Sequence, residues 1–287
     1  MISKKTAETE APASSLPLSP ADNESNHSAV VELRQVGLSF GDKQVLDDVS
    51  LRVQRQERLV IIGQSGAGKT TILRLILGIL SPTVGSVFFD DLEIALLLPR
   101  ELQRARMRMG MVYQDAALLS SKTVRGNLAL PLQELTDKTE AEIDQIVEEK
   151  LDLVEMSGNE DLMPHELSGG MRKRVGIARA LVMEPELILF DEPTAGLDPV
   201  VSAVIDQLIV TLSEKSKTTS VIVTHLMNSA FRVATRMAML HRGKIIEEGT
   251  PDSLKQSTNP ILVQFLSGST EGPMLDRSKY HMLSPAD

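Results

Sequence analysis

Cysteine is missing from this sequence of 287 residues, and its basic residues are outnumbered by its acidic ones. Without a thiol the chain can form no disulfide, no thiolate metal site and no cysteine-based redox centre. The 30 Lys and Arg residues against 39 Asp and Glu residues give a formal net charge of −9. A net acidic chain has no electrostatic reason to bind nucleic acid by itself. Thiol chemistry is therefore excluded, and we expect no nucleic-acid partner.

Long hydrophobic runs are missing as well. No apolar run approaches the roughly 18 residues needed to cross a bilayer, and the richest stretches, 72–80 and 94–98, are short. Residues 1–5 contain two lysines but no apolar stretch follows, so they are not a secretory signal, and the acidic residues within 8–24 argue against a transit peptide. We expect a soluble intracellular protein, without direct membrane insertion, that reaches a membrane only through a partner.

The sequence divides into three segments. Residues 1–28 are rich in Ala, Ser, Pro, Asn and Glu with almost no apolar periodicity, so we predict that they are disordered. The hydrophobic content of 42% allows a real core, which we place in one domain of residues 29–266. Residues 267–287 exceed what that core needs. They either form a frayed terminus or reach a neighbouring subunit, and both interpretations stay open.

The first part of the domain has a strand–loop–helix pattern. Alternating apolar residues over 30–53 predict β-strands, and the wholly apolar run 59–62 is typical of a strand covered on both faces. A glycine-rich loop follows, and helical spacing that includes Ile79 predicts a helix from Lys69 to a stop at 81–82. This order of elements gives the glycine loop the context of a phosphate-binding loop.

The second part continues the alternation of helices and strands. Thr139 and Glu142 fit a capping box in the mostly helical region of about 115–170. Two short apolar strands and one helix are predicted at 187–190, 220–224 and 200–214, respectively. Alternating strands and helices predict an α/β fold, a parallel sheet with helices on its faces.

The glycine loop matches the pattern G-x-x-x-x-G-K-[ST]. Its residues are Gly63, Gln64, Ser65, Gly66, Ala67, Gly68, Lys69 and Thr70, and we add Thr71 to the nucleotide-binding set. The glycines let backbone N–H groups turn inward around phosphate oxygens, and the following helix adds the positive end of its dipole. Lys69 would contact the β- and γ-phosphates, and the Thr70 hydroxyl would bind Mg²⁺. ATP and Mg²⁺ are therefore the expected ligands.

Two carboxylates, Asp191 and Glu192, end the apolar run 187–190. A carboxylate at the carboxyl end of a strand beside a phosphate loop is where hydrated Mg²⁺ would be held. The general base that activates the attacking water must also be a carboxylate near the γ-phosphate. The spacing alone does not decide which residue performs which task.

A second anion site is predicted at the start of another helix, away from the phosphate loop. The segment is Leu167-Ser168-Gly169-Gly170-Met171. It precedes a helix predicted at 172–182, so bare N–H groups and a positive dipole end would meet there. The basic residues that follow are interpreted as a solvated basic face: Arg172, Lys173 and Arg174. A chain that already has a phosphate loop has no local use for this second site.

Together these segments resemble the ATP-binding cassette (ABC) ATPases over roughly residues 30–265. The resemblance implies a P-loop NTPase core with a RecA-like sheet, an antiparallel β subdomain and an inserted helical subdomain at about 115–170. It implies that Asp191 holds Mg²⁺ and that Glu192 is the general base. It also implies that Ser168, Gly169 and Gly170 cap the γ-phosphate on the opposite subunit, so that a head-to-tail homodimer encloses two ATP molecules.

Four further residues receive roles from the resemblance. Phe40 fits the aromatic that stacks on adenine, although one apolar residue in a β-pattern could also belong to the core. Gln114 resembles the Q-loop glutamine that senses Mg²⁺ and the attacking water, and His225 resembles the switch histidine at the γ-phosphate. Asp198 resembles the D-loop residue that crosses between subunits. Leu226 departs from the family, which usually has Asp there; we expect hydrolysis to persist with altered switch packing.

Three features are similar to the Mla/Mkl branch of this family, which serves lipid trafficking. They are the small pair and leucine at 116–118, the basic helix 171–180 and the tail 265–273. This resemblance implies an MlaE-like permease and an MCE-domain lipid-binding protein as partners, at the cytoplasmic side of an inner or plasma membrane. The segment 115–117 is expected near the permease's coupling helix. Two alternatives stay open: the ATPase of a small-solute importer, for example for amino acids, and a non-transport ABC scaffold.

Overall fold

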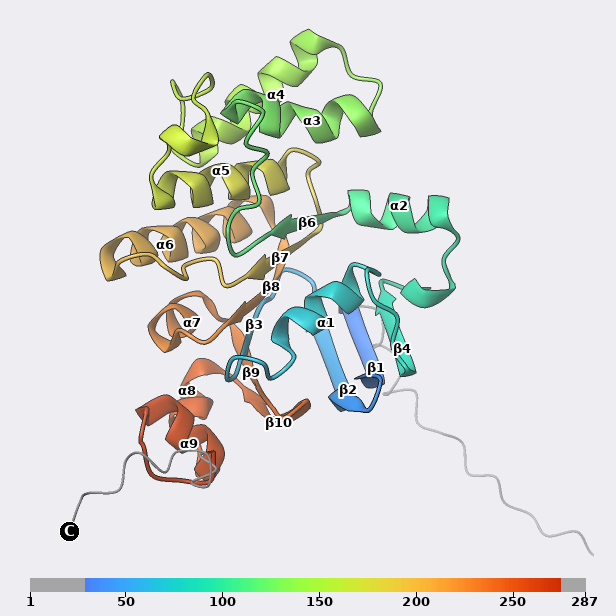
Figure 1. Ribbon diagram of the computed structural model, residues 1–287, viewed down its shortest axis with the longest axis vertical. Coiled ribbons are helices and arrows are strands. Elements are labelled where there is room, and N and C mark those ends of the chain that lie inside the picture. Colours follow the sequence, from blue (N-terminus) through green and yellow to red (C-terminus); the bar gives the residue numbers. More distant parts are fainter. Residues whose placement is uncertain (1–28, 275–287) are drawn as a thin grey trace, which may run out of the picture.

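The computed structural model describes residues 29–274, so the predicted disorder of 1–28 and the end of the predicted tail, 275–287, lie outside the described residues. Two sheets organise this part of the chain (Figure 1). The antiparallel sheet has the order β2-β1-β4-β5 and consists of β1 (Ala29–Phe40), β2 (Lys43–Gln54), β4 (Val84–Phe89) and β5 (Leu92–Glu93). The larger sheet has the order β10-β9-β3-β8-β7-β6 and consists of β3 (Arg58–Ile62), β6 (Met109–Val112), β7 (Leu187–Asp191), β8 (Thr219–Thr224), β9 (Arg236–His241) and β10 (Lys244–Gly249). Its neighbouring strands pair parallel, except that β10 pairs antiparallel with β9 at one edge.

The α-helices of the described part differ in where they lie relative to the larger sheet. They are α1 (Lys69–Ile76), α2 (Pro99–Met107), α3 (Val124–Leu135), α4 (Glu140–Leu153), α5 (Gly169–Leu181), α6 (Pro199–Ser216), α7 (Met227–Val233), α8 (Pro251–Lys255) and α9 (Pro260–Ser267). Short 3₁₀ helices span Ile94–Leu96 and Pro164–Glu166. Helix α1 contacts both β4 and the strands β7 and β8, so it lies between the two sheets. Helices α3 and α4 lie beyond α5 at one end of the molecule, and α8 and α9 lie at the other end (Figure 1).

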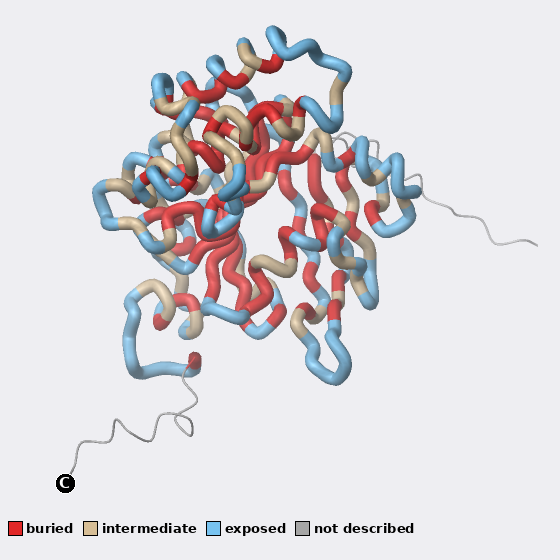
Figure 2. The backbone as a smooth tube through the Cα atoms, turned by 45° about the horizontal axis from the view of Figure 1, so that its top comes forward, coloured by how far each residue is buried: buried red, intermediate tan, exposed pale blue. Residues whose placement is uncertain are grey.

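The central strands of the larger sheet are buried on both faces. On β3, Leu59 and Ile61 pack into a core with α1 and the smaller sheet, whereas Val60 and Ile62 pack into a core with α5, α6 and α7. Figure 2 shows buried backbone running along the central strands. A strand covered on both faces needs no polar residue, which explains the continuous apolar run. The predicted α/β class, a parallel sheet with an antiparallel β subdomain, is confirmed.

Helix α1 ends earlier than the sequence pattern predicts. The helix ends at Ile76, and Gly78 takes a left-handed φ of 65°. The N–H of Ile79 donates to the carbonyl of Arg74, and that of Gly78 donates to the carbonyl of Leu75, which together form a Schellman motif. The prediction that the helix includes Ile79 and stops at 81–82 is therefore wrong, and Ile79 is 53% exposed.

Helices α4 and α5 each begin directly after a residue whose side chain caps the helix. The capping box of Thr139 and Glu142 is confirmed at the start of α4. Helix α5 begins at Gly169, three residues before the predicted start, because the Ser168 hydroxyl accepts a hydrogen bond from the N–H of Met171. Both glycines of this segment therefore belong to the first turn of the helix.

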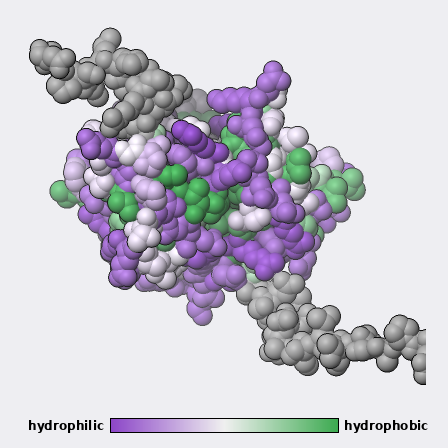
Figure 3. All heavy atoms as spheres, turned by 90° about the horizontal axis from the view of Figure 1, so that it is seen from below, coloured by the Kyte–Doolittle hydropathy of each residue, from purple (hydrophilic) through white to green (hydrophobic). Residues whose placement is uncertain are grey.

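No helix within residues 29–274 combines the length and the apolar character that spanning a bilayer requires. Seen from below, the surface is mostly hydrophilic, and its hydrophobic residues form small separate groups (Figure 3).

Candidate ATP site

The phosphate loop connects β3 to α1 and lines a cavity of about 470 Å³. Gly63 and Gly68 have φ values of 156° and 108°. A Cβ on Gly63 would lie 2.3 Å from the carbonyl oxygen of Leu240, and one on Gly68 would lie 2.8 Å from Cδ2 of Leu46. Backbone angle and close approach therefore both require glycine at these positions. The cavity is lined by residues 43–45, 65–71 and 242–243 together with Gln114 and Glu192.

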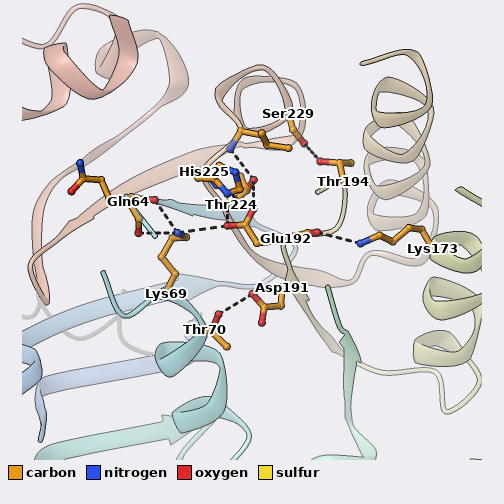
Figure 4. Close-up of polar contacts among 12 residues, drawn as sticks. Gln64, Lys69, Thr70, Lys173, Asp191, Glu192, Thr194, Thr224, His225 and Ser229 are labelled. Carbon is orange, nitrogen blue, oxygen red and sulfur yellow. Dashed lines mark hydrogen bonds and ion pairs between the residues drawn. The ribbon is translucent and has the colours of Figure 1, made fainter. Parts of the chain in front are cut away.

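The Lys69 ammonium lies beside the loop and the carboxylate pair. It donates hydrogen bonds to the carbonyl oxygens of Gly63, at 2.8 Å, and Gln64, at 3.1 Å. It also lies 3.6 Å from Oε1 of Glu192 (Figure 4). Burial lowers the pKa of Lys69, and the nearby carboxylates oppose this shift. A buried cation at the mouth of a loop of inward N–H groups can bind phosphate oxygens.

Thr70 and Asp191 come together from α1 and β7. The Thr70 hydroxyl donates a hydrogen bond of 3.0 Å to Oδ1 of Asp191, and burial raises the pKa of this carboxyl group. A hydroxyl beside a carboxylate is a pair of hard oxygen ligands of the kind Mg²⁺ prefers. Among the described residues, no cluster of three or more His, Cys, Asp or Glu side chains could hold a metal ion. The pair therefore fits Mg²⁺ only if phosphate oxygens and water complete the ligands, which is how Mg²⁺ is held at nucleotide sites.

The Glu192 carboxylate is held by the end of strand β8. Oε2 accepts hydrogen bonds from the Thr224 hydroxyl, at 3.0 Å, and from the N–H of His225, at 3.2 Å. Oε1 lies 2.9 Å from Nδ1 of His225 (Figure 4). The sequence predicted His225 near this site, whereas the role of Thr224 was missed. A carboxylate fixed at a nucleotide cavity can orient and deprotonate a water molecule.

The prediction of a solvated basic face is wrong for Lys173. This residue is only 6% exposed, and its ammonium donates hydrogen bonds to the carbonyl oxygens of Gln114 and Glu192, the latter at 3.4 Å. Burial lowers the pKa of Lys173. Helical spacing could have predicted that Lys173 is buried, because it lies four residues before Ile177 and eight before Leu181, on the same buried face of the helix. Two neighbours remain outside the core: the exposed Arg172 and the partly exposed Arg174.

The predicted second anion site lies in a separate hollow of about 660 Å³. Ser168, Gly169 and Gly170 at the start of α5 line it together with Asp198 at the start of α6. Oδ1 of Asp198 caps α6 by accepting hydrogen bonds from the N–H groups of residues 200 and 201, at 2.9 and 3.0 Å. No residue lines both this hollow and the phosphate-loop cavity as they are described within 29–274. One copy of the chain therefore keeps the two predicted anion sites apart.

Two further sequence predictions concern Phe40 and Leu226. Phe40 ends β1 and is 52% exposed, so the alternative that it belongs to the core is wrong. It pairs with Lys43, which lines the phosphate-loop cavity. Leu226 occupies the N-cap position of α7 and makes no side-chain hydrogen bond to the helix. It lines an apolar hollow of about 190 Å³ together with Leu197.

A phosphate loop after a central parallel strand, with a carboxylate pair on a nearby strand, defines a nucleoside-triphosphatase. The ABC transporter family model matches residues 46–195. The "Probable ribonucleotide transport ATP-binding protein mkl" of Mycobacterium leprae is 42% identical over 244 residues, which cover 85% of this chain and 70% of that protein. The "Intermembrane phospholipid transport system ATP-binding protein MlaF" of Haemophilus influenzae is 41% identical over 251 residues, 88% of this chain and 94% of that protein.

A solved structure agrees with these sequence matches. It is the dimer of the ATP-binding cassette MJ0796 in a post-hydrolysis state bound to ADP and Pi, with a TM-score of 0.70 and 33% identity. The match covers 77% of this chain and 98% of that one. The chain belongs to the ABC transporter family, as an ATP-binding subunit that hydrolyses ATP.

Proposed function

We propose that this chain dimerises around two ATP molecules and drives phospholipid transport through an MlaE-like permease. The observation that carries the lipid assignment is the 41% identity to an intermembrane phospholipid transport ATPase over 94% of that relative's length. The wider complex would include an MCE-domain lipid-binding protein. The chain would act at the cytoplasmic side of an inner or plasma membrane, bound to the permease.

ATP would bind at the phosphate-loop cavity. Residues 63–71, of which 65–71 line this cavity, would surround the phosphates with N–H groups and the Lys69 ammonium, and Phe40 would stack on the adenine from the exposed end of β1. Thr70 and Asp191 would hold Mg²⁺ together with the phosphates, and Gln114 would complete this set from the wall of the same cavity. When bound, Mg²⁺ neutralises charge on the phosphate oxygens.

Hydrolysis would use the carboxylate at the end of β7. Glu192 accepts a proton from the attacking water, because its carboxylate lines the cavity and is held by donors from β8. His225 contacts that carboxylate and orients the γ-phosphate.

The dimer follows from the separation of the two anion sites. Within one chain the start of α5 and the phosphate loop line different hollows. ATP on one copy would be capped by Ser168, Gly169 and Gly170 of a second copy, and Asp198 would cross at the same interface. The dimeric state of the MJ0796 cassette supports this arrangement.

The domain division is part of the proposal. Residues 29–266 form the ABC ATPase domain, and the inserted helices within about 115–170 face the permease. The segment 115–117 would lie near the permease's coupling helix, and the tail 267–287 would contact a neighbouring subunit.

A small-solute importer is the second candidate. The name of the Mycobacterium leprae relative refers to ribonucleotide transport, and that protein is as similar to this chain as the phospholipid transport ATPase is. The cassette chemistry is the same in both cases, so the substrate depends on the permease.

Affinity purification from gently solubilised membranes, with mass spectrometry of the bound proteins and lipids, tests the proposal. An MlaE-like permease with an MCE-domain protein and phospholipid is the expected result. A solute permease without lipid would favour the importer. Recovery without any membrane protein would overturn the transport assignment and favour a non-transport scaffold. Glu192→Gln, purified in parallel, controls for complexes that form only transiently, since it should prolong the ATP-bound state.

A further inference from the structure

Three non-glycine residues next to the ATP site have left-handed backbone conformations. Ala116 and Ala117 have φ values of 57° and 47°, and Glu192 has a φ of 48°. Side chains crowd the backbone in this region of conformational space, so such residues persist only where their surroundings fix them. The first two follow Gln114, and the third bears the proposed general base.

Helix α5 supplies cations to the carbonyl groups of all three residues. Arg179 donates to the carbonyl oxygens of Ala116, at 2.8 Å, and Ala117, at 2.7 Å. Lys173 donates to the carbonyl oxygen of Glu192, at 3.4 Å, and to that of Gln114. A single helix therefore holds both the loop after β6 and the loop after β7 (Figure 4 shows Lys173 and Glu192).

The same face of α5 is shaped for close contact with the loop after β6. Lys173, Gly176 and Arg179 follow each other at intervals of three residues, which places them along one side of the helix. A Cβ on Gly176 would lie 3.1 Å from Cβ of Ala116, so a larger residue would push the loop away. Lys173 is 6% exposed, and both of its acceptors are main-chain oxygens rather than a carboxylate.

We propose that Lys173 is a positioning residue for ATP hydrolysis: it fixes the Gln114 and Glu192 segments relative to each other. This inference rests on the roles proposed above for those two residues. Lys173 is not among the residues that line the phosphate-loop cavity, and it acts through the main chain of Gln114 and Glu192, which do line it. Removing it frees two loops to shift, and misplacement of a catalytic group by about 1 Å can lower a rate roughly 10²-fold.

The position of Lys173 also relates hydrolysis to the dimer. Helix α5 begins with the glycines proposed to contact ATP of the second copy, and Lys173 lies in the second turn of this helix. A displacement of the helix start on dimer closure would be transmitted along a rigid helix to both loops. In the proposed dimer, Lys173 would therefore connect the start of α5 to the segment that bears the general base.

Lys173→Met tests the proposal in the purified full-length chain. The variant keeps a long apolar side chain but removes the ammonium. We expect kcat for ATP hydrolysis to fall by a factor of ten or more, roughly up to the 10²-fold that such misplacement can cost. We expect little change in KM for ATP or in the binding of a non-hydrolysable ATP analogue. Lys173→Arg keeps a charged donor at this position and should recover most of the rate.

Lys150→Met is the matched control. Lys150 is 5% exposed on α4 and pairs with Glu149 and Glu184, away from the nucleotide cavity. It reports what the loss of a buried lysine does to stability alone. If Lys173→Met retains kcat, or lowers kcat only as far as Lys150→Met does at an equal unfolding midpoint, the positioning role is wrong.

The Glu192→Gln background separates this inference from the proposed function. If Lys173 acts through Glu192, adding Lys173→Met to Glu192→Gln should cause little further loss of rate. Additive losses would show that Lys173 does not act through Glu192, which overturns the proposed link between the two segments while leaving the general base intact. Normal hydrolysis by Glu192→Gln alone would instead overturn the assignment of the base, whatever Lys173→Met does.

Discussion

The Nδ1 atom of His225 lies 2.9 Å from Oε1 of Glu192, so the histidine after β8 contacts the carboxylate after β7 within one chain. Lys69 lies 3.6 Å from the same oxygen. The Glu192 carboxylate thus connects the phosphate loop with the ends of β7 and β8. When phosphate groups bind, they would attract the Lys69 ammonium away from Glu192. His225 and Thr224 would then remain as the partners of the Glu192 carboxylate.

Glu192→Gln should stop hydrolysis and preserve ATP binding. The amide keeps the shape of the side chain but cannot accept a proton from water, so we expect kcat to fall roughly 10²–10⁴-fold. The variant should form an ATP-dependent dimer detectable by gel filtration. Glu148→Gln makes the same chemical change on the exposed surface of α4 and serves as the control. Wild-type turnover by Glu192→Gln would contradict the assignment of the base.

Lys69→Ala should weaken ATP binding. The buried ammonium is the charged donor at the phosphate loop, and hydrogen bonds to charged groups contribute about 1.5–3 kcal/mol. We therefore expect the Kd for ATP, measured by calorimetry, to rise roughly ten- to hundredfold. Lys215→Ala on the exposed part of α6 is the matched control. Unchanged ATP affinity in Lys69→Ala would remove the phosphate-loop interpretation.

Local motifs made the ATP site predictable from the sequence. The phosphate loop and the carboxylates after β7 are contiguous patterns whose chemistry does not depend on distant residues. Helical spacing indicates that Lys173 is buried, but its acceptors are main-chain carbonyl groups 59 and 19 residues away along the chain, and side-chain patterns do not predict such contacts. The end of α1 was misplaced for a different reason: apolar periodicity continued through Gly78, although its left-handed conformation ends the helix.

Asp206→Asn should change how stability depends on pH. Asp206 is fully buried, and burial raises its pKa, although Ser229 and Arg232 donate hydrogen bonds to it. The folded state therefore binds this proton more tightly than the unfolded state does. The protonated Asp206 therefore contributes to the free energy of unfolding at pH values below 3.8, the ordinary pKa of Asp. This contribution is lost as the pH rises through the raised pKa of the folded state.

The variant lacks this titration. The free energy of unfolding of Asp206→Asn minus that of the wild type should consequently increase as pH rises above 3.8, by at most about 1.4 kcal/mol per pH unit. Urea titrations at several pH values measure this difference, with the exposed Asp42→Asn as the control. A difference that stays constant or decreases with pH would show that the folded-state pKa of Asp206 is not raised.

Leu226→Asp should stabilise the chain and leave hydrolysis intact. Leu226 is the N-cap residue of α7, and its side chain leaves the first N–H groups of this helix without a cap. An Asp at an N-cap contributes about 1 kcal/mol, which corresponds to roughly 2–4 °C in Tm for a domain of this size. The N–H of residue 226 donates to the Thr224 hydroxyl through the main chain, so the exchange keeps that contact beside Glu192.

Leu226→Asn and Leu226→Ala separate capping from packing. Asn caps without adding charge and should stabilise nearly as much as Asp, whereas Ala neither caps nor fills the hollow beside Leu197 and should lower Tm. If Leu226→Asp melts below Leu226→Ala, packing in that hollow outweighs the cap. If it stops hydrolysis at unchanged stability, the leucine belongs to the switch itself, because a cap on α7 alone leaves the groups around Glu192 where they are.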